Sequence, residues 1–263
     1  DAFTARETFR AIRAKSNRME STDIELINFS TQERDLETAI DYLQENGVYS
    51  NLKYEKRITK QLTDLLQLGR EIEAAGTAQS IAGYSSGMYK ELTSGEAFDN
   101  PDATLTPEEI IHEGREAIRS RIAVYPNTMI IGVSAYKVLM NHTSLLDKIR
   151  YTGLLKISQD LLKSIFEIED IFVGMSVQSA DGETFSDIWE DNIILAYVDK
   201  SDKNNRTEYN PSFGYTFQRE GMPETDTYFE NGGKIKVIRC TDNYGLKITA
   251  PDAGYLIKNT NQS

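Results

Sequence analysis

The sequence predicts an α+β protein, and three observations support this prediction. A long amphipathic helical pattern covers residues 52–78, strand-like and helical runs alternate over residues 107–198, and short strand-like runs separated by polar turns follow residue 199. Hydrophobic residues make up 39% of the 263 residues and charged residues 27%, which is typical of a folded globular protein. The chain is long enough for one large domain or two smaller ones that share a core.

The N-terminal region is expected to be extended at first and helical later. The first twenty residues are polar and lack a broad apolar face, so they read as an arm or loop. Residues 22–29 partly alternate between apolar and polar side chains, which indicates a short strand. Ser30 and Glu33 have the spacing of a capping box, so a helix is expected to begin there and to end at Asn46 and Gly47. Its inward side chains would be Leu36, Ile40 and Leu43.

The strongest helical pattern follows directly. Apolar residues recur at spacings of three and four along residues 52–78, at Tyr54, Ile58, Leu62, Leu65, Leu66, Ile72 and Ala75. At 1.5 Å per residue, such a helix would be roughly 40 Å long. The opposite face carries charged side chains, including Glu55, Lys56, Lys60, Asp64, Arg70 and Glu73. This pattern predicts a helix that lies across a sheet and keeps one face in water.

The middle of the chain is expected to form an α/β core of roughly 90–100 residues. Residues 83–106 are rich in turn formers and predict a linker. A helix should begin at Pro107, with Thr106 as N-cap and Glu108 and Glu109 in its first turn. Further helices are expected at residues 135–141, 144–151 and 159–166. Strands are expected at residues 129–133, 171–177, 193–198, 215–218, 235–240, 245–249 and 255–259, the first of them buried on both faces.

The sequence offers no catalytic, cofactor-binding or metal-binding motif. The nearest approach to a phosphate-binding loop, Gly83 to Lys90, has the wrong spacing. His112 lacks the second histidine of a zinc-protease helix, and His142 is explained by a favourable interaction with the C-terminus of the preceding helix. Residues 199–205 lack the glycine and the closing glutamate of a calcium loop. We therefore predict that the protein is not an enzyme and needs no cofactor.

The single cysteine and the hydropathy pattern limit where the protein works. Cys240 lies in a strand-like run, so a buried structural thiol is expected, and no intrachain disulfide is possible. That composition suits assembly in a reducing cytoplasm. No apolar run approaches the roughly 18 residues that cross a bilayer, so no membrane association is expected. The N-terminus shows no secretory signal, and proteolytic maturation or truncation there is left open.

Charge is distributed unevenly along the chain. The net charge is −12, which disfavours sequence-independent binding of nucleic acid. The first twenty residues nevertheless hold five bases and three acids, whereas residues 181–191 hold five acids and no base. Opposite charges on two segments favour contacts between different surfaces of identical copies. The alternative is two solvated surfaces of opposite sign.

Several short segments, taken in order, resemble the major capsid proteins of tailed bacteriophages. The most specific is Tyr-Pro-Asn-Thr-Met-Ile-Ile-Gly at residues 125–132, followed by Val138, Leu139, Asn141 and His142. Each motif is weak alone, but their order over about residues 50–260 is fairly specific. The other matching segments are residues 68–71, 74–75, 92–95, 99–101, 172–174, 188–198, 211–217 and 254–259.

The resemblance implies a Hong Kong 97-like capsid fold with a long spine helix, peripheral β-strands, an axial α/β domain and an extended E-loop. Residues 1–50 would then be the N-arm remnant and the E-loop. Residues 51–106 would be the peripheral domain, with the spine helix and its exit linker. Residues 107–205 would be the axial domain, and residues 206–263 would be C-terminal strands that return through both domains.

The resemblance also implies a function, namely self-assembly into the icosahedral head shell that encloses the double-stranded DNA of a phage. The copies would form pentamers and hexamers in the virion after assembly in the host bacterial cytoplasm. Scaffold and portal proteins are expected partners, decoration proteins are left open, and the packaged DNA would be held without sequence-specific contacts. Two alternatives stay open: a shell protein of a non-viral nanocompartment with the same fold, and an α/β enzyme.

The charge pattern and the resemblance together give the candidate contact residues. The basic residues of one subunit would meet the acidic patch of the next. The basic set is Arg10, Arg13, Lys15 and Arg18, and the acidic set is Glu183, Asp187, Glu190 and Asp191. Some capsids of this fold link a lysine to an asparagine between subunits, but we do not predict such a link at Lys15.

Overall fold

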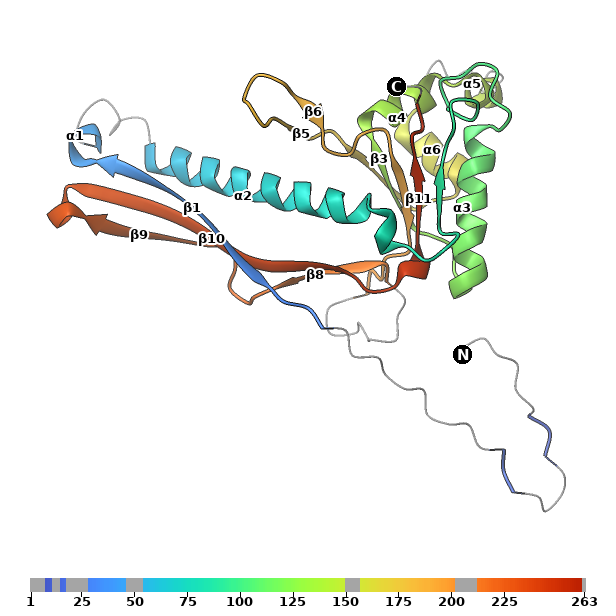
Figure 1. Cartoon of the computed structure of the whole chain (residues 1–263), viewed down its shortest axis with the longest axis horizontal. Helices are drawn as coiled ribbons and strands as arrows, with labels where there is room; N and C mark the ends of the chain where they lie inside the picture. The colour runs from blue at the N-terminus through green and yellow to red at the C-terminus, as the bar shows by residue number, and fades with distance from the viewer. Residues whose placement is uncertain are drawn as a thin grey trace.

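The computed structural model describes residues 8–10, 15–17, 28–45, 54–149, 157–201 and 212–261. Within them the chain divides into an elongated half and a compact half, which lie end to end (Figure 1). The elongated half is a long helix on a long, narrow sheet, and the compact half is a second sheet covered by shorter helices. In the described part of the chain, none of the helices combines the length and apolarity that a bilayer crossing requires.

The sheet of the elongated half is organised around one central strand, β10 (Ile235–Ile248). One edge of β10 pairs antiparallel with β1 (Gln32–Asp41), and the other edge pairs with β9 (Glu224–Glu230) and then β8 (Gly214–Gln218). A short helix, α1 (Tyr42–Glu45), follows β1. The central strand is therefore hydrogen-bonded on both edges along most of its length.

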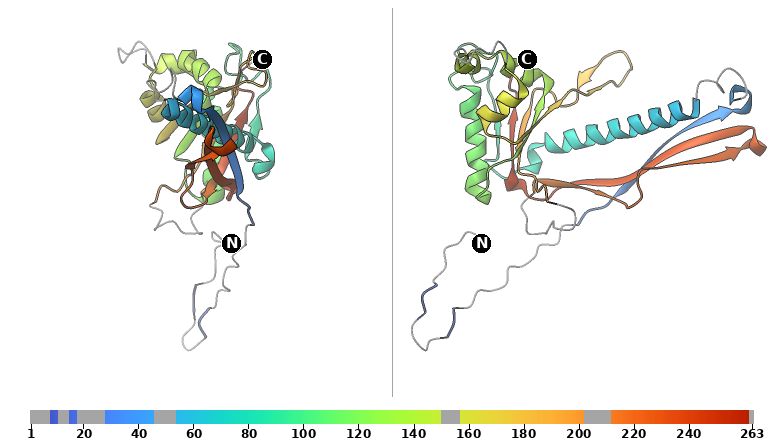
Figure 2. Two further views of the ribbon diagram at one scale, coloured as in Figure 1. Left: turned by 90° about the vertical axis from the view of Figure 1, so that its left-hand side faces the viewer. Right: turned by 180° about the vertical axis from the view of Figure 1, so that it is seen from behind.

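The long helix α2 (Tyr54–Ala78) lies along this sheet, as Figure 2 shows from behind. Ile58 and Leu62 are buried against Ile40 of β1 and against Ile238 and Cys240 of β10. Its outer face is exposed, so the prediction of a helix with one wet face is confirmed. The predicted burial of Leu65 is wrong, because that side chain is exposed. Cys240 is a buried free thiol, as predicted.

An aromatic and charged cluster also holds β1 and β10 to α2. The Arg34 guanidinium of β1 donates to both carboxylate oxygens of Glu73 on α2, at 2.7 and 2.8 Å. The same guanidinium stacks over the Tyr244 ring of β10 at 4.1 Å, and Arg70 of α2 lies 5.2 Å from that ring. The hydrogen bond with Glu73 raises the pKa of Arg34, so the guanidinium stays charged.

The helix predicted from Ser30 to Asn46 is wrong over its main part, because residues 32–41 form β1. The local capping signal is overridden by ten consecutive residue pairs with β10. Of the three side chains expected to point inward, Ile40 is buried, whereas Leu36 and Leu43 are exposed. Asn46, Gly47 and most of the strand expected at residues 22–29 lie outside the described residues.

The compact half is built on a five-stranded sheet in the order β2-β11-β7-β3-β4. Its strands are β2 (Tyr89–Glu91), β3 (Thr128–Gly132), β4 (Asp170–Gly174), β7 (Ile193–Ala196) and β11 (Gly254–Lys258). Its helices are α3 (Pro107–Ile122), α4 (Val133–Asn141), α5 (Thr143–Ile149) and α6 (Gln159–Phe166). The predicted core is thus confirmed, with β3 buried on both faces.

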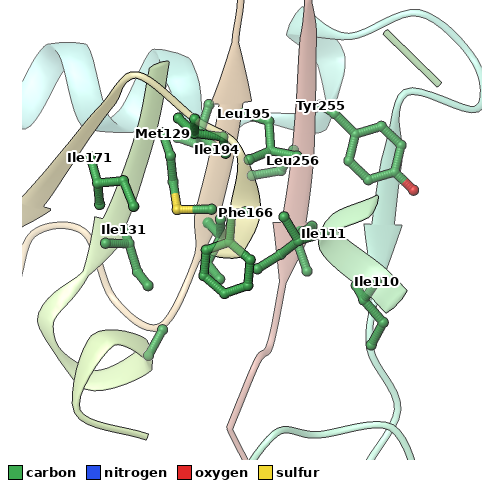
Figure 3. Packing of buried hydrophobic residues seen from close by; sticks show 14 of the residues in the cluster. Ile110, Ile111, Met129, Ile131, Phe166, Ile171, Ile194, Leu195, Tyr255 and Leu256 are labelled. Atoms are coloured by element: carbon green, nitrogen blue, oxygen red, sulfur yellow. The ribbon is translucent and has the colours of Figure 1, made fainter. Parts of the chain in front are cut away.

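The core of the compact half lies between the sheet and its helices. Ile110 and Ile111 of α3 and Phe166 of α6 pack against apolar side chains of β3, β7 and β11 (Figure 3). Thr106 caps α3 as predicted, in a complete capping box with Glu109. The hydrogen bonds from Thr106 lower the pKa of Glu109. Strong local signals therefore place α3 correctly.

Three features differ from the expected order of elements. The expected linker at residues 83–106 contains β2, which pairs in parallel with β11. The two strands expected at residues 235–240 and 245–249 are one continuous strand, β10. The strand β9 was not predicted, and its three acids obscure the strand pattern. Short 3₁₀ turns complete the described chain, at Ile81–Gly83, Asn231–Gly233 and Pro251–Ala253.

The turn between β3 and α4 leaves no room for a side chain at Gly132. A Cβ atom built there would lie 1.9 Å from the backbone oxygen of Glu190. We therefore expect Gly132→Ala to lower the free energy of unfolding by more than about 2 kcal/mol, because the backbone must move. Urea unfolding of unassembled subunits measures this loss.

Gly69→Ala is the matched control, because Gly69 lies inside α2 with open space around it. It should raise stability by about 0.5–1 kcal/mol through helix propensity alone. Equal effects of the two substitutions would show that the close approach at Gly132 is not a constraint.

Candidate assembly surface

A small hairpin projects from the compact half beside α2 (Figure 1). It consists of β5 (Val177–Gln178) and β6 (Ser186–Asp187), which pair antiparallel, and we call residues 175–189 the β5–β6 hairpin. Two-stranded hairpins are marginally stable by themselves in water. The contacts that hold this hairpin in place and the side chains that it exposes therefore determine whether it can bind a partner.

The root of the hairpin is fastened to α2. The Glu71 carboxylate accepts a hydrogen bond from the Trp189 indole Nε1 at 2.9 Å and another from the Ser176 hydroxyl at 2.8 Å. Just beyond the C-terminal end of α2, Gln79 donates to the backbone oxygen of Ile188 at 3.0 Å. The residues that enter and leave the hairpin are thus both bonded to α2 or to the residue that follows it.

The buried Trp189 ring also fills the space over Gly174 at the end of β4. A Cβ atom at Gly174 would lie 2.1 Å from the indole ring, so the ring packs directly on the backbone. Trp189 therefore joins three parts of the structure: the central sheet, the hairpin and the long helix. We call this contact the Trp189 junction.

The tip of the hairpin is a tight turn around Asp181. Its carboxylate accepts hydrogen bonds from the backbone N–H groups of Glu183 and Thr184 and from the hydroxyls of Ser179 and Thr184. These bonds hold the pKa of Asp181 well below its usual range. The tip therefore carries a fixed negative charge at any physiological pH.

The rest of the hairpin surface is apolar and acidic. Met175, Val177 and Phe185 are exposed, and Phe185 shows 65% of its surface to solvent. No lysine or arginine occurs among residues 175–191. An exposed apolar surface edged by charge is typical of a protein–protein contact. Sequence reasoning found the acids of this segment but missed its apolar side chains, whose alternation at Met175 and Val177 was a usable signal.

The predicted acidic residues fall into two groups. Glu183 lies exposed near the hairpin tip, and Asp187 lies on β6. Glu190 is exposed just beyond the hairpin, whereas Asp191 is half-buried and accepts a hydrogen bond from the backbone N–H of Asn261 at 2.9 Å. Glu183 is therefore accessible to a partner and Asp187 is half-buried, whereas Asp191 is hydrogen-bonded within its own chain.

Of the four predicted basic residues, the structure describes two. Arg10 and Lys15 are exposed, and Arg13 and Arg18 lie outside the described residues. Asn17 donates to the backbone oxygen of Phe9 at 3.0 Å, so the two described N-terminal segments are adjacent. Figures 1 and 2 show both segments well away from the body of the chain, on the opposite side from the hairpin.

The two histidines sit in different environments. His112 is exposed on α3. His142 is half-buried between α4 and α5, and its Nδ1 lies 2.7 Å from the Ser144 hydroxyl and accepts from the Ser144 backbone N–H at 3.3 Å. Burial lowers the pKa of His142, which favours the neutral ring. The neutral ring can accept the backbone N–H of Ser144 at the start of α5. His142 is also the C-cap of α4, where its backbone N–H donates to the Leu139 oxygen at 3.3 Å.

The remaining candidate for metal chemistry gives no site in the described chain. Asp199 is buried and accepts from the backbone N–H of Ser201 at 2.9 Å, while residues 202–205 of the calcium-like segment lie outside the described residues. Among the described side chains, no three His, Cys, Asp or Glu residues are grouped so as to hold a metal ion.

Known proteins resemble this chain over most of its length. It is 41% identical over 262 residues to the major capsid protein of Burkholderia phage BcepMu, a match that covers 99% of this chain and 84% of the relative. A phage-related protein from Bordetella bronchiseptica RB50 superposes with a TM-score of 0.77 at 27% identity, covering 89% of this chain and 76% of that one. No protein-family model matches the sequence.

A more distant structure shares the fold. The mature capsid of bacteriophage PhiM1 superposes with a TM-score of 0.58 at 13% identity, covering 99% of this chain and 80% of that chain. At 13% identity, this structural similarity shows only that the two proteins share a fold.

The Trp189 junction predicts that Glu71 matters more than its neighbours on α2. Glu71→Ala should lower the free energy of unfolding by about 2–3 kcal/mol, because it leaves the packed indole N–H and the Ser176 hydroxyl without an acceptor. Glu73→Ala is the matched control. It removes the exposed partner of Arg34 and should lose at most about 1 kcal/mol. Urea unfolding of the two variants side by side gives both values, and equal losses would contradict the special role of the junction.

His142 predicts a pH dependence of stability. Its pKa is lowered in the folded chain, so the stability it confers is present above the unfolded value of about 6.5 and is lost as the pH falls below that value. His142→Gln should therefore lose less stability than the wild type between pH 7.5 and 5.5. His112→Gln, at the exposed histidine, should behave like the wild type. Thermal unfolding across this pH range measures the difference, and parallel curves for all three proteins would refute the assignment.

Proposed function

The chain belongs to the family of bacteriophage major capsid proteins, and from that membership we propose how its copies contact one another and what the shell encloses. It has the Hong Kong 97-type fold and is a structural protein of the virion that self-assembles into the icosahedral head shell. It is not an enzyme. The 41% identity over nearly the whole chain is the observation that carries this function.

In the proposed division of the chain, α2 is the spine helix and the elongated half is the peripheral domain. Residues 51–106 then form the spine helix and its exit, and residues 107–205 form the axial domain. The strands after residue 206 return through both sheets, in keeping with β8, β9 and β10 in the one and β11 in the other. Within residues 1–50, the part before β1 would be the arm and the E-loop.

The proposed partners follow from the family membership and from the net charge of the chain. Copies would form pentamers and hexamers around the axial domain, with scaffold and portal proteins completing assembly in the host bacterial cytoplasm. Packaged DNA would be held by confinement, because a chain with a net charge of −12 has little general affinity for phosphate. Decoration proteins are a further candidate partner. A phage head is favoured over a non-viral nanocompartment because the 41% identical relative is a phage protein.

The proposed subunit contact joins the basic N-terminal segment to the acidic hairpin of a neighbouring copy. Arg10, Arg13, Lys15 and Arg18 would face Glu183, Asp187 and Glu190, with Asp191 contributing less because it is bonded to Asn261. The separation of the two surfaces in Figure 1 supports a partner in another copy rather than in the same chain. A contact between two different surfaces can repeat around a ring, as a shell requires.

Charge reversal tests both the function and this contact. The wild type should form closed shells by negative-stain microscopy and elute at high mass in size-exclusion chromatography. The Arg13→Glu, Arg18→Glu double variant should form none, because two carboxylates then face the acidic hairpin in place of two guanidinium groups. Adding Glu183→Lys and Asp187→Lys to that variant should restore shells.

Arg219→Glu with Lys247→Glu is the matched control, because it changes the net charge equally at two exposed positions of the elongated half. This variant should assemble normally. Intact shells from the Arg13→Glu, Arg18→Glu variant would count against the contact, and a monomeric wild type under all conditions would count against the function.

A further inference from the structure

We propose that the β5–β6 hairpin is an apolar docking surface for Phe9 of a neighbouring copy. The inference rests on the proposed subunit contact, which was argued from charged residues alone. It adds an apolar centre to that contact. The occupant is thus the N-terminal segment of a second copy of this chain.

The hairpin exposes apolar side chains on both of its arms. Val177 of β5 pairs with Asp187 of β6, Met175 lies two residues before Val177, and Phe185 directly precedes β6. Met175 and Phe185 expose 66% and 65% of their surfaces. The Trp189 junction fixes the root of the hairpin, which suits these side chains to receive a partner.

A second hairpin cannot be the occupant. Residues 175–191 include Asp181, Glu183, Asp187 and Glu190 and no base, so two hairpins face to face would set carboxylates against carboxylates. Like charges in a shared interface disfavour association. The partner must therefore bring basic side chains together with an apolar one.

The N-terminal segment meets this requirement. Phe9 is 78% exposed and is followed directly by Arg10. The hydrogen bond from Asn17 to the Phe9 backbone oxygen brings residues 15–17, which include Lys15, next to residues 8–10. Phe9 thus has bases near it, whereas Phe185 has Glu183 and Asp187 two residues away on either side. Aromatic anchors at the centre of a contact with charges at its rim are the usual arrangement of a strong interface.

A rival basic surface exists at the start of α2, where Lys56, Arg57 and Lys60 are exposed. The exposed apolar side chains near it are on α1, where Tyr42 and Leu43 lie, rather than among the bases themselves. The N-terminal segment places an aromatic ring and bases within a few residues of one another. Its two described pieces, residues 8–10 and 15–17, lie apart from the body in both views of Figure 2. The experiment below separates the two candidates.

The first test is a double-mutant cycle on assembly. Phe9→Ala and Phe185→Ala should each raise the protein concentration needed for shell assembly by about tenfold, as expected for an anchor residue. The double variant should be no worse than either single variant, because the two side chains lose the same contact. Phe9→Leu should restore most of the assembly. Phe229→Ala, at a phenylalanine 63% exposed on β9, should have no effect.

Cross-linking identifies the occupant directly. Chains carrying Phe9→Cys mixed with chains carrying Phe185→Cys should give a disulfide-linked dimer on non-reducing electrophoresis, and neither variant alone should do so. A dimer formed by Phe185→Cys alone, or by Phe185→Cys with Lys56→Cys in place of Phe9→Cys, would overturn the proposal. The proposal would also be overturned if the double variant raised the protein concentration needed for assembly by about a hundredfold, the product of two independent tenfold effects.

The outcomes also separate this inference from the proposed function. If the phenylalanine variants assemble like the wild type while the arginine reversals still abolish shells, the charge contact stands and the apolar anchor is wrong. If the wild type forms shells and neither set of variants changes them, both contacts are wrong but the shell function stands.

Discussion

The structure depends on the contact of one tryptophan ring with one carboxylate. Trp189 packs on the backbone of Gly174 and donates to Glu71, so the central sheet, the hairpin and the long helix meet at a single point. The neighbouring bonds from Ser176 to Glu71 and from Gln79 to Ile188 add rotational restraint. Because these groups are packed and mutually satisfied, the junction has little freedom to adjust. The direction in which the elongated half leaves the compact half is set there.

The same junction explains how a hairpin of two short strands keeps a defined shape. Such a hairpin would fray in isolation, but here its root is bonded to Glu71 of α2 and its tip is closed around Asp181. In the proposed contact, this rigid presentation would reduce the entropy lost when a neighbouring copy binds. The carboxylates of the hairpin would favour a basic partner there.

The sequence correctly predicted the elements whose structure is determined by the residues within them and directly beside them. The long helix follows from its apolar stripe, α3 from the Thr106 capping box, and β3 from its continuous apolar run. The helix expected from Ser30 failed because pairing with β10, two hundred residues away, decides that segment. The acids of the candidate surface could be read directly, whereas the Trp189 junction could not. Glu71 and Trp189 are 118 residues apart, and no local pattern links them.

The length of α2 gives the Trp189 junction a mechanical meaning. The 25 residues of α2 extend roughly 37 Å, and the paired strand β10 stiffens that half along its length. From Glu71, which contacts Trp189, to the far end of α2 at Tyr54 is roughly 26 Å. A tilt of about 5° at this contact would therefore move the far end by roughly 2 Å. The curvature of a closed shell depends on the angles between neighbouring copies, so a substitution that repacks the Trp189 ring would be expected to change that curvature.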